Sequence, residues 1–170
     1  MTEQTYFEDV KEGQELPEIK ISPDKQQLVK FAAGSGDFNP LHFDENFGML
    51  KPMGLSENIV HGRFKYAQTG RLVFALAGYK GRVKNFGVSY RGMDMLNKPI
   101  TVKGVVTAKR QEGGENLVDL DIWTENGDGK KTTPHMTRLT KTEATSSPMR
   151  RQPPQRRRRG SGGGELAIRE

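Results

Sequence analysis

The sequence contains no cysteine, which excludes disulfide bonds, thiolate metal sites and cysteine nucleophiles. It also has no apolar run near the ~18 residues that a membrane-spanning helix needs, and its polar, acidic start is unlike a signal peptide. We therefore expect a cytoplasmic protein with no membrane partner. Hydrophobic residues make up only 33% of the 170 residues, and about 42% when the 20 glycines are counted and the 4 tyrosines left out, which is below the roughly 45–50% share of ordinary domains counted in the same way. Part of the chain is therefore expected to lie outside any core.

Positive charge is concentrated near the end of the chain. Seven arginines and two glutamates fall within residues 148–170, and the other 147 residues carry 20 basic and 19 acidic side chains. The net charge of +6 is therefore mostly a property of the last residues, and the rest of the chain is close to neutral.

Composition divides the chain into a folded domain, residues 1–144, and a tail, residues 145–170. The tail joins four consecutive arginines to a Gly/Ser run, and such a segment buries too little apolar surface to fold, so we expect disorder. An arginine-rich patch for nucleic acid or a membrane surface is the alternative. The tail has no aromatic residue to stack on bases, so nucleic acid is not an expected partner.

Periodicity in the first 144 residues predicts an α+β fold. A strand over 16–22 precedes a helix that begins at Pro23, with Ser22 as its N-cap, and ends at 34–36. A second helix over 62–77 is apolar around most of its circumference, which predicts that other elements surround it. Strands are expected over 83–90, 100–109 and 116–124, with a hairpin turn at 111–115. A long helix on a curled antiparallel sheet follows.

The motif Ser35-Gly36-Asp37-Phe38-Asn39-Pro40-Leu41-His42 carries the first candidate chemistry. Pro40 and Gly36 favour a loop of unusual, fixed shape, across which Asp37 and His42 can converge. A carboxylate and an imidazole that share one water can exchange protons near pH 7, as general acid–base catalysis requires. In the alternative interpretation Asp37 only caps a turn and His42 is an ordinary loop histidine.

A second motif, Ile59-Val60-His61-Gly62, lies directly before the second helix. The N–H groups of a first helical turn have no intrahelical partner and can hold an anion or a developing oxyanion. Gly62 allows a ligand to approach this backbone closely. Arg63 and Lys65 place positive charge where it opposes the helix dipole. His61 taken alone favours a structural role.

Together the two motifs resemble the MaoC-like hydratases and dehydratases, which include the (R)-specific enoyl-coenzyme A hydratases. The resemblance spans residues 5–132 and implies a hot-dog fold, in which a curved antiparallel sheet wraps a long helix. It also implies a hydro-lyase of fatty acid metabolism that interconverts a trans-2-enoyl thioester and a (3R)-hydroxyacyl thioester. The substrate would be an acyl-CoA or acyl-carrier thioester, and the chain would form a homodimer.

The resemblance also implies roles for residues that match the family motif. Asp37 and His42 would be catalytic, and Gly62 would bind the thioester oxygen through its N–H. Asn39 would brace the loop, and His61 and Arg63 are grouped with it and Gly62 as substrate-binding positions. Arg63 departs from the family, which often has methionine there. No cofactor is expected, and no metal, because Asp37, His42, Asp44 and His61 lack tight ligand spacing on one element.

Two other functions remain open. A hot-dog thioesterase commonly has a carboxylate on the central helix, and this chain has no Asp or Glu between Glu57 and Asp94. A non-catalytic acyl-thioester-binding module is the second alternative. The Asp37/His42 pair favours the enzyme, whereas Arg63 and the tail keep the binding module open.

The stretch 132–140 is a poor candidate for the final strand that the family adds. Pro134 removes a ladder donor, and Met136 and Leu139 are three apart, so they would face opposite sides of a strand. Two interpretations carry equal weight. Either the natural terminal strand has been replaced, for example by a frameshifted end, or this member has a weak edge strand and a long tail.

Overall fold

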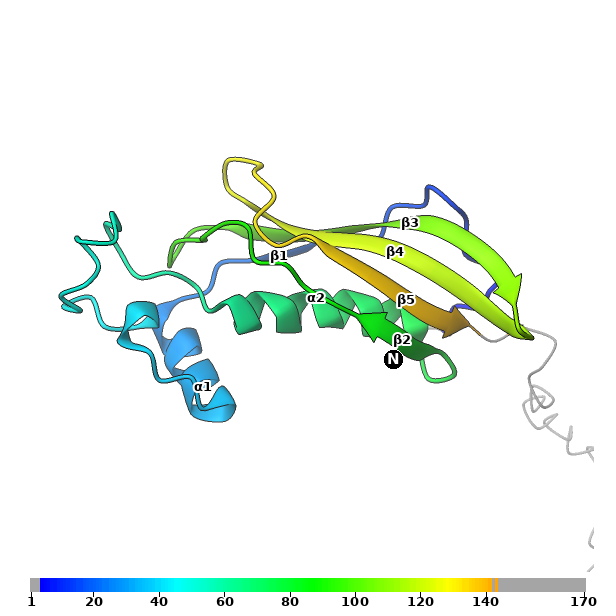
Figure 1. The fold of residues 1–170 in the computed structure, drawn as a ribbon, viewed down its shortest axis with the longest axis horizontal. Helices are drawn as coiled ribbons and strands as arrows, with labels where there is room; N and C mark the ends of the chain where they lie inside the picture. Colours follow the sequence, from blue (N-terminus) through cyan, green and yellow to red (C-terminus); the bar gives the residue numbers. More distant parts are fainter. Residues whose placement is uncertain (1–3, 142, 144–170) are drawn as a thin grey trace, which may run out of the picture.

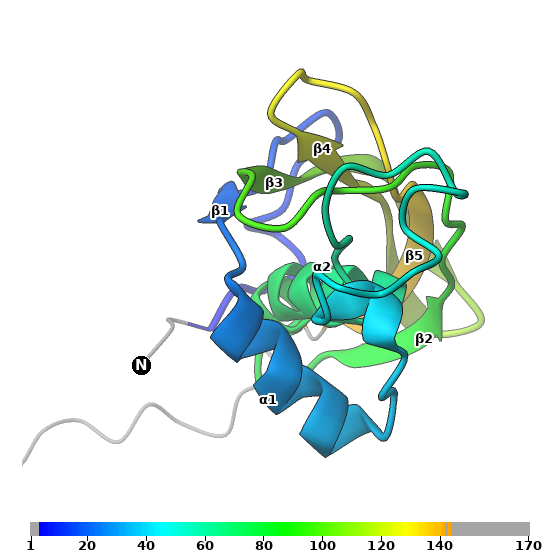
Figure 2. The same cartoon turned by 90° about the vertical axis from the view of Figure 1, so that its left-hand side faces the viewer.

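A five-stranded antiparallel sheet in the order β1-β3-β4-β5-β2 curls around one long helix, α2 (Figures 1 and 2). The computed structural model describes residues 4–141 and 143, so the predicted tail of 145–170 lies outside the described residues. The elements are β1 Ile19–Ile21, α1 Lys25–Ser35, the short 3-10 helix η1 Pro40–His42, α2 Gly62–Ala77, β2 Arg82–Phe86, β3 Ile100–Glu112, β4 Glu115–Asn126 and β5 His135–Lys141.

The main core lies between α2 and the concave face of the sheet. Leu72 and Val73 of α2 are buried there against valines, leucines and an isoleucine of β3, β4 and β5. This burial follows from the apolar spacing of the helix, as predicted. The opposite face of α2 is not covered, and the Phe74 side chain is 64% exposed. The monomer therefore surrounds the helix only in part.

Helix α1 places the first candidate motif at one end of α2 (Figure 2). Its N-cap is Asp24, whose side chain accepts a hydrogen bond from the Gln27 N–H at 2.7 Å, and not Ser22 as predicted. Its C-cap is Gly36, with a left-handed φ of 73° that favours glycine. Leu28 is buried in a second cluster with residues of the Val60–Phe64 region. Asp37 thus leaves the helix next to the start of α2.

The predicted strand over 83–90 is shorter in the structure, because β2 ends at Phe86. Beyond it the chain leaves the regular ladder and follows the segment that precedes β5. Ser89 N–H donates to the Pro134 carbonyl at 3.1 Å, and Arg91 N–H donates to the Thr132 carbonyl at 2.9 Å. The β3–β4 hairpin forms as predicted and turns at Gly113 and Gly114, both with positive φ.

The prediction that 132–140 is a poor candidate for the final strand is wrong, because His135–Lys141 form strand β5. This strand pairs with both β4 and β2 and therefore lies inside the sheet, not at its edge. Met136 and Leu139 do face opposite sides, at 74% and 0% exposure. Every second residue of β5 faces inward, and three of these four residues are polar, so the hydrophobicity pattern does not indicate a strand. The inward residues are His135, Thr137, Leu139 and Lys141.

The inward polar residues of β5 obtain most of their hydrogen bonds inside the protein. His135 Nε2 lies 3.2 Å from Thr69 Oγ1, and its Nδ1 lies 2.9 Å from the Thr133 carbonyl. The ammonium of Lys141, on a side chain buried beside the end of α2, donates to the carbonyls of Thr5 and Leu76. Burial lowers the pKa of Lys141 from 10.5 to about 8, since a buried charge loses hydration.

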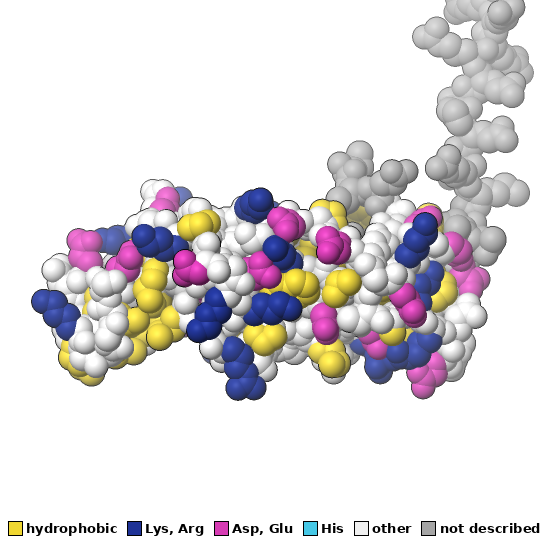
Figure 3. Space-filling view, turned by 90° about the horizontal axis from the view of Figure 1, so that it is seen from above, with side chains coloured by type: hydrophobic (Ala, Val, Ile, Leu, Met, Phe, Trp, Pro, Cys, Tyr) yellow, Lys and Arg dark blue, Asp and Glu magenta, His cyan; other side chains and the backbone are white. Residues whose placement is uncertain are grey.

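The convex face of the sheet carries interspersed basic and acidic side chains and no large patch of one sign (Figure 3). Among the described residues, no helix is long and apolar enough to cross a membrane.

The lowered pKa of Lys141 predicts a rise in stability at alkaline pH. The unfolded chain binds more protons than the folded chain between pH about 8 and 10.5, so the free energy of unfolding should increase across this window. Lys141→Met should flatten that increase, whereas Lys130→Met, at an exposed turn, should retain it. Urea denaturation at about pH 7.5, below this window, and at about pH 8.5 and 9.5, within it, measures the free energy of unfolding. Identical pH slopes in wild type and Lys141→Met would contradict the assignment.

Candidate active site

The loop that follows α1 is shaped by its own side chains. Asn39 Oδ1 accepts the Leu41 N–H at 3.0 Å and caps the short helix η1, which begins at Pro40. This local bond accounts for the turn between Asp37 and His42. Asn39 is itself exposed and does not line the cleft described below.

The buried side-chain amide of Asn58 holds the same loop in place. Asn58 is 2% exposed, and its Nδ2 donates to the carbonyls of Leu41 at 3.0 Å and Asp44 at 2.9 Å. The Ile59 N–H also donates to the Leu41 carbonyl, at 3.3 Å. Sequence reasoning missed Asn58, although a polar residue at the start of the apolar Ile59-Val60 pair was a usable signal.

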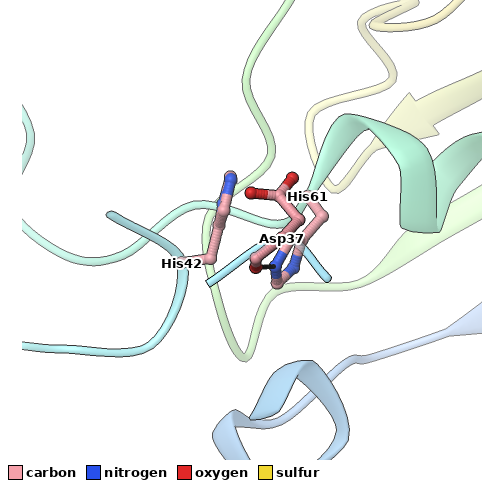
Figure 4. Close-up of side chains that lie close together, drawn as sticks. All are labelled: Asp37, His42 and His61. Carbon is pink, nitrogen blue, oxygen red and sulfur yellow. Dashed lines mark hydrogen bonds between the residues drawn. The ribbon is translucent and has the colours of Figure 1, made fainter. Parts of the chain in front are cut away.

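The structure brings Asp37 and His42 together at one end of α2. His42 is buried, and its Nδ1 lies 2.9 Å from the Ile59 carbonyl. A carbonyl only accepts, so Nδ1 carries the proton and Nε2 of the neutral ring has a free lone pair. Figure 4 shows this ring directed to the same side as the Asp37 carboxylate. The pair can therefore share a small molecule between a base and a carboxyl group.

His61 contacts both members of this pair. Its fully buried ring stacks on that of His42, with centroids 3.8 Å apart, and its Nε2 donates to the Asp37 carbonyl at 3.2 Å. Burial, and then the nearby charge of His42, lowers the pKa of His61, so it stays neutral at pH 7. His61 does not line the cleft. Its grouping with the substrate-binding residues stays a prediction, and its contacts in the structure are to the two members of the pair.

Asp37, His42 and His61 each offer one possible metal-ligand atom, and these atoms lie within 4.8 Å of one another. The arrangement does not point them at a common centre. Figure 4 shows the ring nitrogens of His61 on the side away from the Asp37 carboxylate, and His61 Nε2 already bonds the Asp37 carbonyl. Holding an ion there would require His61 to turn, so the expectation of no metal stays a prediction.

A cleft of about 310 Å³ opens beside the pair and contains the start of α2. Its walls include Asp37, His42, Gly62 and Arg63, all predicted from the sequence. No side chain caps α2 at His61. The first intrahelical bond is that of the Phe64 N–H to the His61 carbonyl at 3.1 Å, so the Gly62 and Arg63 N–H groups precede the helical ladder. Arg63 is exposed at the rim of the cleft. The cleft thus combines an acid–base pair with a donor for a developing oxyanion.

A buried ion pair, absent from the sequence-based predictions, forms another wall of the cleft. Lys65 Nζ lies 2.6 Å from Asp94 Oδ2 and donates to the Gly92 carbonyl at 2.9 Å, and both charged side chains are about fully buried. Lys65 lines the cleft together with Tyr90 and Met93. No local pattern signals these contacts, because they join residues far apart in the chain.

Comparison with known proteins identifies the family of this chain. The family model described as "MaoC like domain" matches residues 7–127. The chain is 30% identical over 116 residues to a 3-hydroxybutyryl-CoA dehydratase of Methylorubrum extorquens, covering 62% of this chain and 69% of that protein.

Solved structures show the fold. The (R)-hydratase of A. caviae, involved in PHA biosynthesis, superposes with a TM-score of 0.69 at 22% identity, covering 76% of this chain and 96% of that one. The HadBC (3R-hydroxyacyl-ACP dehydratase) complex of Mycobacterium tuberculosis gives a TM-score of 0.61 at 13% identity, covering 76% and 96%. These likenesses confirm the predicted hot-dog fold. With the family model matched over most of the chain, the protein belongs to the MaoC-like domain family.

Proposed function

We propose that this protein is a hydratase/dehydratase that interconverts a trans-2-enoyl thioester and a (3R)-hydroxyacyl thioester. One observation carries the proposal: Asp37, His42 and Gly62, whose N–H precedes the first intrahelical bond of α2, line the same cleft. The family membership and the 3-hydroxybutyryl-CoA dehydratase relative support it. Coenzyme A or an acyl carrier would hold the acyl group, and fatty acid metabolism is the corresponding setting.

The contacts suggest how the chemistry divides between the residues. A water between Asp37 and His42 loses a proton to this pair, and its oxygen bonds to C3 of the enoyl group. The electrons of the C2–C3 double bond move toward the thioester oxygen, which the Gly62 N–H stabilises as it gains negative charge. Return of a proton to C2 completes the addition, and the reverse sequence is the dehydration.

The two alternatives have less support. A non-catalytic acyl-binding module would not require the free Nε2 of His42 to face the same side as a carboxylate. A thioesterase with a carboxylate on the central helix is disfavoured because α2, Gly62–Ala77, has no acidic residue.

We also propose a homodimer. The exposed face of α2 presents Phe74 at 64% exposure, and a second copy could bury it. The solved HadBC relative is described as a complex, which supports assembly of such domains in pairs.

Loss of either member of the pair should abolish most turnover. Asp37→Asn and His42→Ala should each lower kcat on crotonyl-CoA by at least ~10²-fold, because each removes a proton-transfer group. Asp44→Asn is the matched control, since this neighbouring side chain accepts the Asn46 N–H at 2.9 Å and is not among the residues that line the cleft. The loss of enoyl absorbance measures activity, and circular dichroism checks folding. A folded Asp37 or His42 variant with over half of wild-type turnover would refute the assignment.

Charge on the exposed face of α2 should weaken self-association. Phe74→Glu should raise the dimer dissociation constant at least ~10-fold, because a charge cannot be buried unpaired at an apolar contact. Met136→Glu is the control, because this side chain lies on the face of the sheet that points away from α2 and is 74% exposed. It should leave the dissociation constant unchanged. Sedimentation equilibrium measures both. A wild-type mass near 19.0 kDa at micromolar concentration would contradict the dimer itself.

A further inference from the structure

Tyr90 lies across the start of α2, where no sequence pattern placed it. A Cβ built on Gly62 would come within 2.9 Å of Tyr90 Cε1 and within 3.2 Å of two further ring atoms. The ring therefore covers Gly62 at van der Waals contact, and any larger residue at position 62 would require the ring to move. Tyr90 also lines the cleft that contains Asp37 and His42.

The segment that carries Tyr90, residues 87–95, is held from two sides. On one side the Arg91 and Gly92 N–H groups donate to the Thr132 carbonyl at 2.9 and 3.0 Å. On the other side Lys65 Nζ bonds the Gly92 carbonyl and Asp94 Oδ2. These bonds come immediately after Tyr90 in the chain. They hold the backbone of this segment in place and so limit how far the ring can move from Gly62.

The ion pair is better explained by this placement than by stability. A buried ion pair generally contributes little net stability, because desolvation of both charges offsets their attraction. Asp94 Oδ1 is buried with no hydrogen-bond partner among the described residues, which adds to the cost. The Val60 N–H donates to the Asp94 carbonyl at 2.8 Å. Lys65 and Asp94 thus join the 87–95 segment to both α2 and the loop before it.

The position of Tyr90 bears on the substrate through the chemistry proposed above. With the thioester oxygen at the Gly62 N–H and C2 and C3 beside Asp37 and His42, the remaining acyl carbons must leave along another wall. Tyr90 and Met93 contribute one apolar part of the lining, beside Ile59 and Val60, whereas the charged, exposed Arg63 suits the polar carrier. The cleft of about 310 Å³ is at the lower end of the range for ligand sites.

We propose that Tyr90 sets the acyl-chain length, closing the cleft beyond the first carbons so that the site takes short-chain 2-enoyl thioesters. This inference rests on the proposed function, because it assumes that an acyl thioester occupies the cleft. Removing the ring should open the far wall to longer chains.

The test compares binding of butyryl-CoA and octanoyl-CoA, saturated thioesters that need no turnover, to the full chain by calorimetry. Wild type should bind butyryl-CoA more tightly. Tyr90→Ala should shift the ratio of dissociation constants at least ~10-fold in favour of octanoyl-CoA, since each added methylene in an apolar pocket changes binding appreciably. Tyr90→Phe keeps the ring and should keep the wild-type ratio within about two-fold. Tyr79→Ala, an exposed tyrosine beyond the far end of α2, controls for loss of a surface ring.

Three results would overturn the proposal. An unchanged ratio in folded Tyr90→Ala would show that the ring does not limit the chain. Equal weakening of both ligands would show that Tyr90 contacts the carrier common to both. A shift in Tyr90→Phe as large as in Tyr90→Ala would assign the effect to the hydroxyl. Because binding is measured without turnover, inactivity toward crotonyl-CoA would refute the proposed hydratase reaction and leave the length test valid.

Discussion

The hydrogen bond from His42 Nδ1 to the Ile59 carbonyl, 2.9 Å long, is the contact on which the proposed chemistry depends. It assigns the proton to one ring nitrogen and leaves the other as a base. It also ties the loop after α1 to the residues that start α2, so the acid–base pair and the oxyanion donor share one frame. Asn58 and the Ile59 N–H reinforce the same junction through the Leu41 carbonyl.

His61 also affects the electrostatic environment of this junction. It lies buried against His42 with Nδ1 unpartnered among the described residues and its pKa lowered. Burial lowers the pKa of His61 and disfavours a charge on its ring, which would repel a charge on the stacked His42. Its bond to the Asp37 carbonyl holds the backbone of the acid while leaving the carboxylate unused. The second histidine therefore contacts both members of the pair and helps to fix their positions.

The parts of the fold that the sequence predicted are those in which a local pattern and the tertiary environment agree. Helix α2 and the β3–β4 hairpin have apolar spacings that match their buried faces, and paired glycines mark the turn. Asp37 and His42 were found because five residues in a Gly/Pro loop suffice to bring them together. The sequence makes the 132–140 stretch a poor strand candidate because Met136 and Leu139 are three apart, and the structure shows that polar His135 and Lys141 occupy inward positions instead. Their partners, Thr69 and Leu76, lie in α2, and no local reading supplies them.

The same limit explains why the sequence did not show the second wall of the site. Tyr90 belongs to a segment that leaves its strand early, and nothing in its neighbours signals that it reaches Gly62. Lys65 seemed only to oppose the helix dipole, yet Asp94, 29 residues later, neutralises it in the interior. Local motifs thus define the end of the cleft that holds Asp37, His42 and Gly62. The opposite wall is held by contacts between residues far apart in the chain, so a substitution at Tyr90 or Met93 would reshape the cleft without altering the motifs.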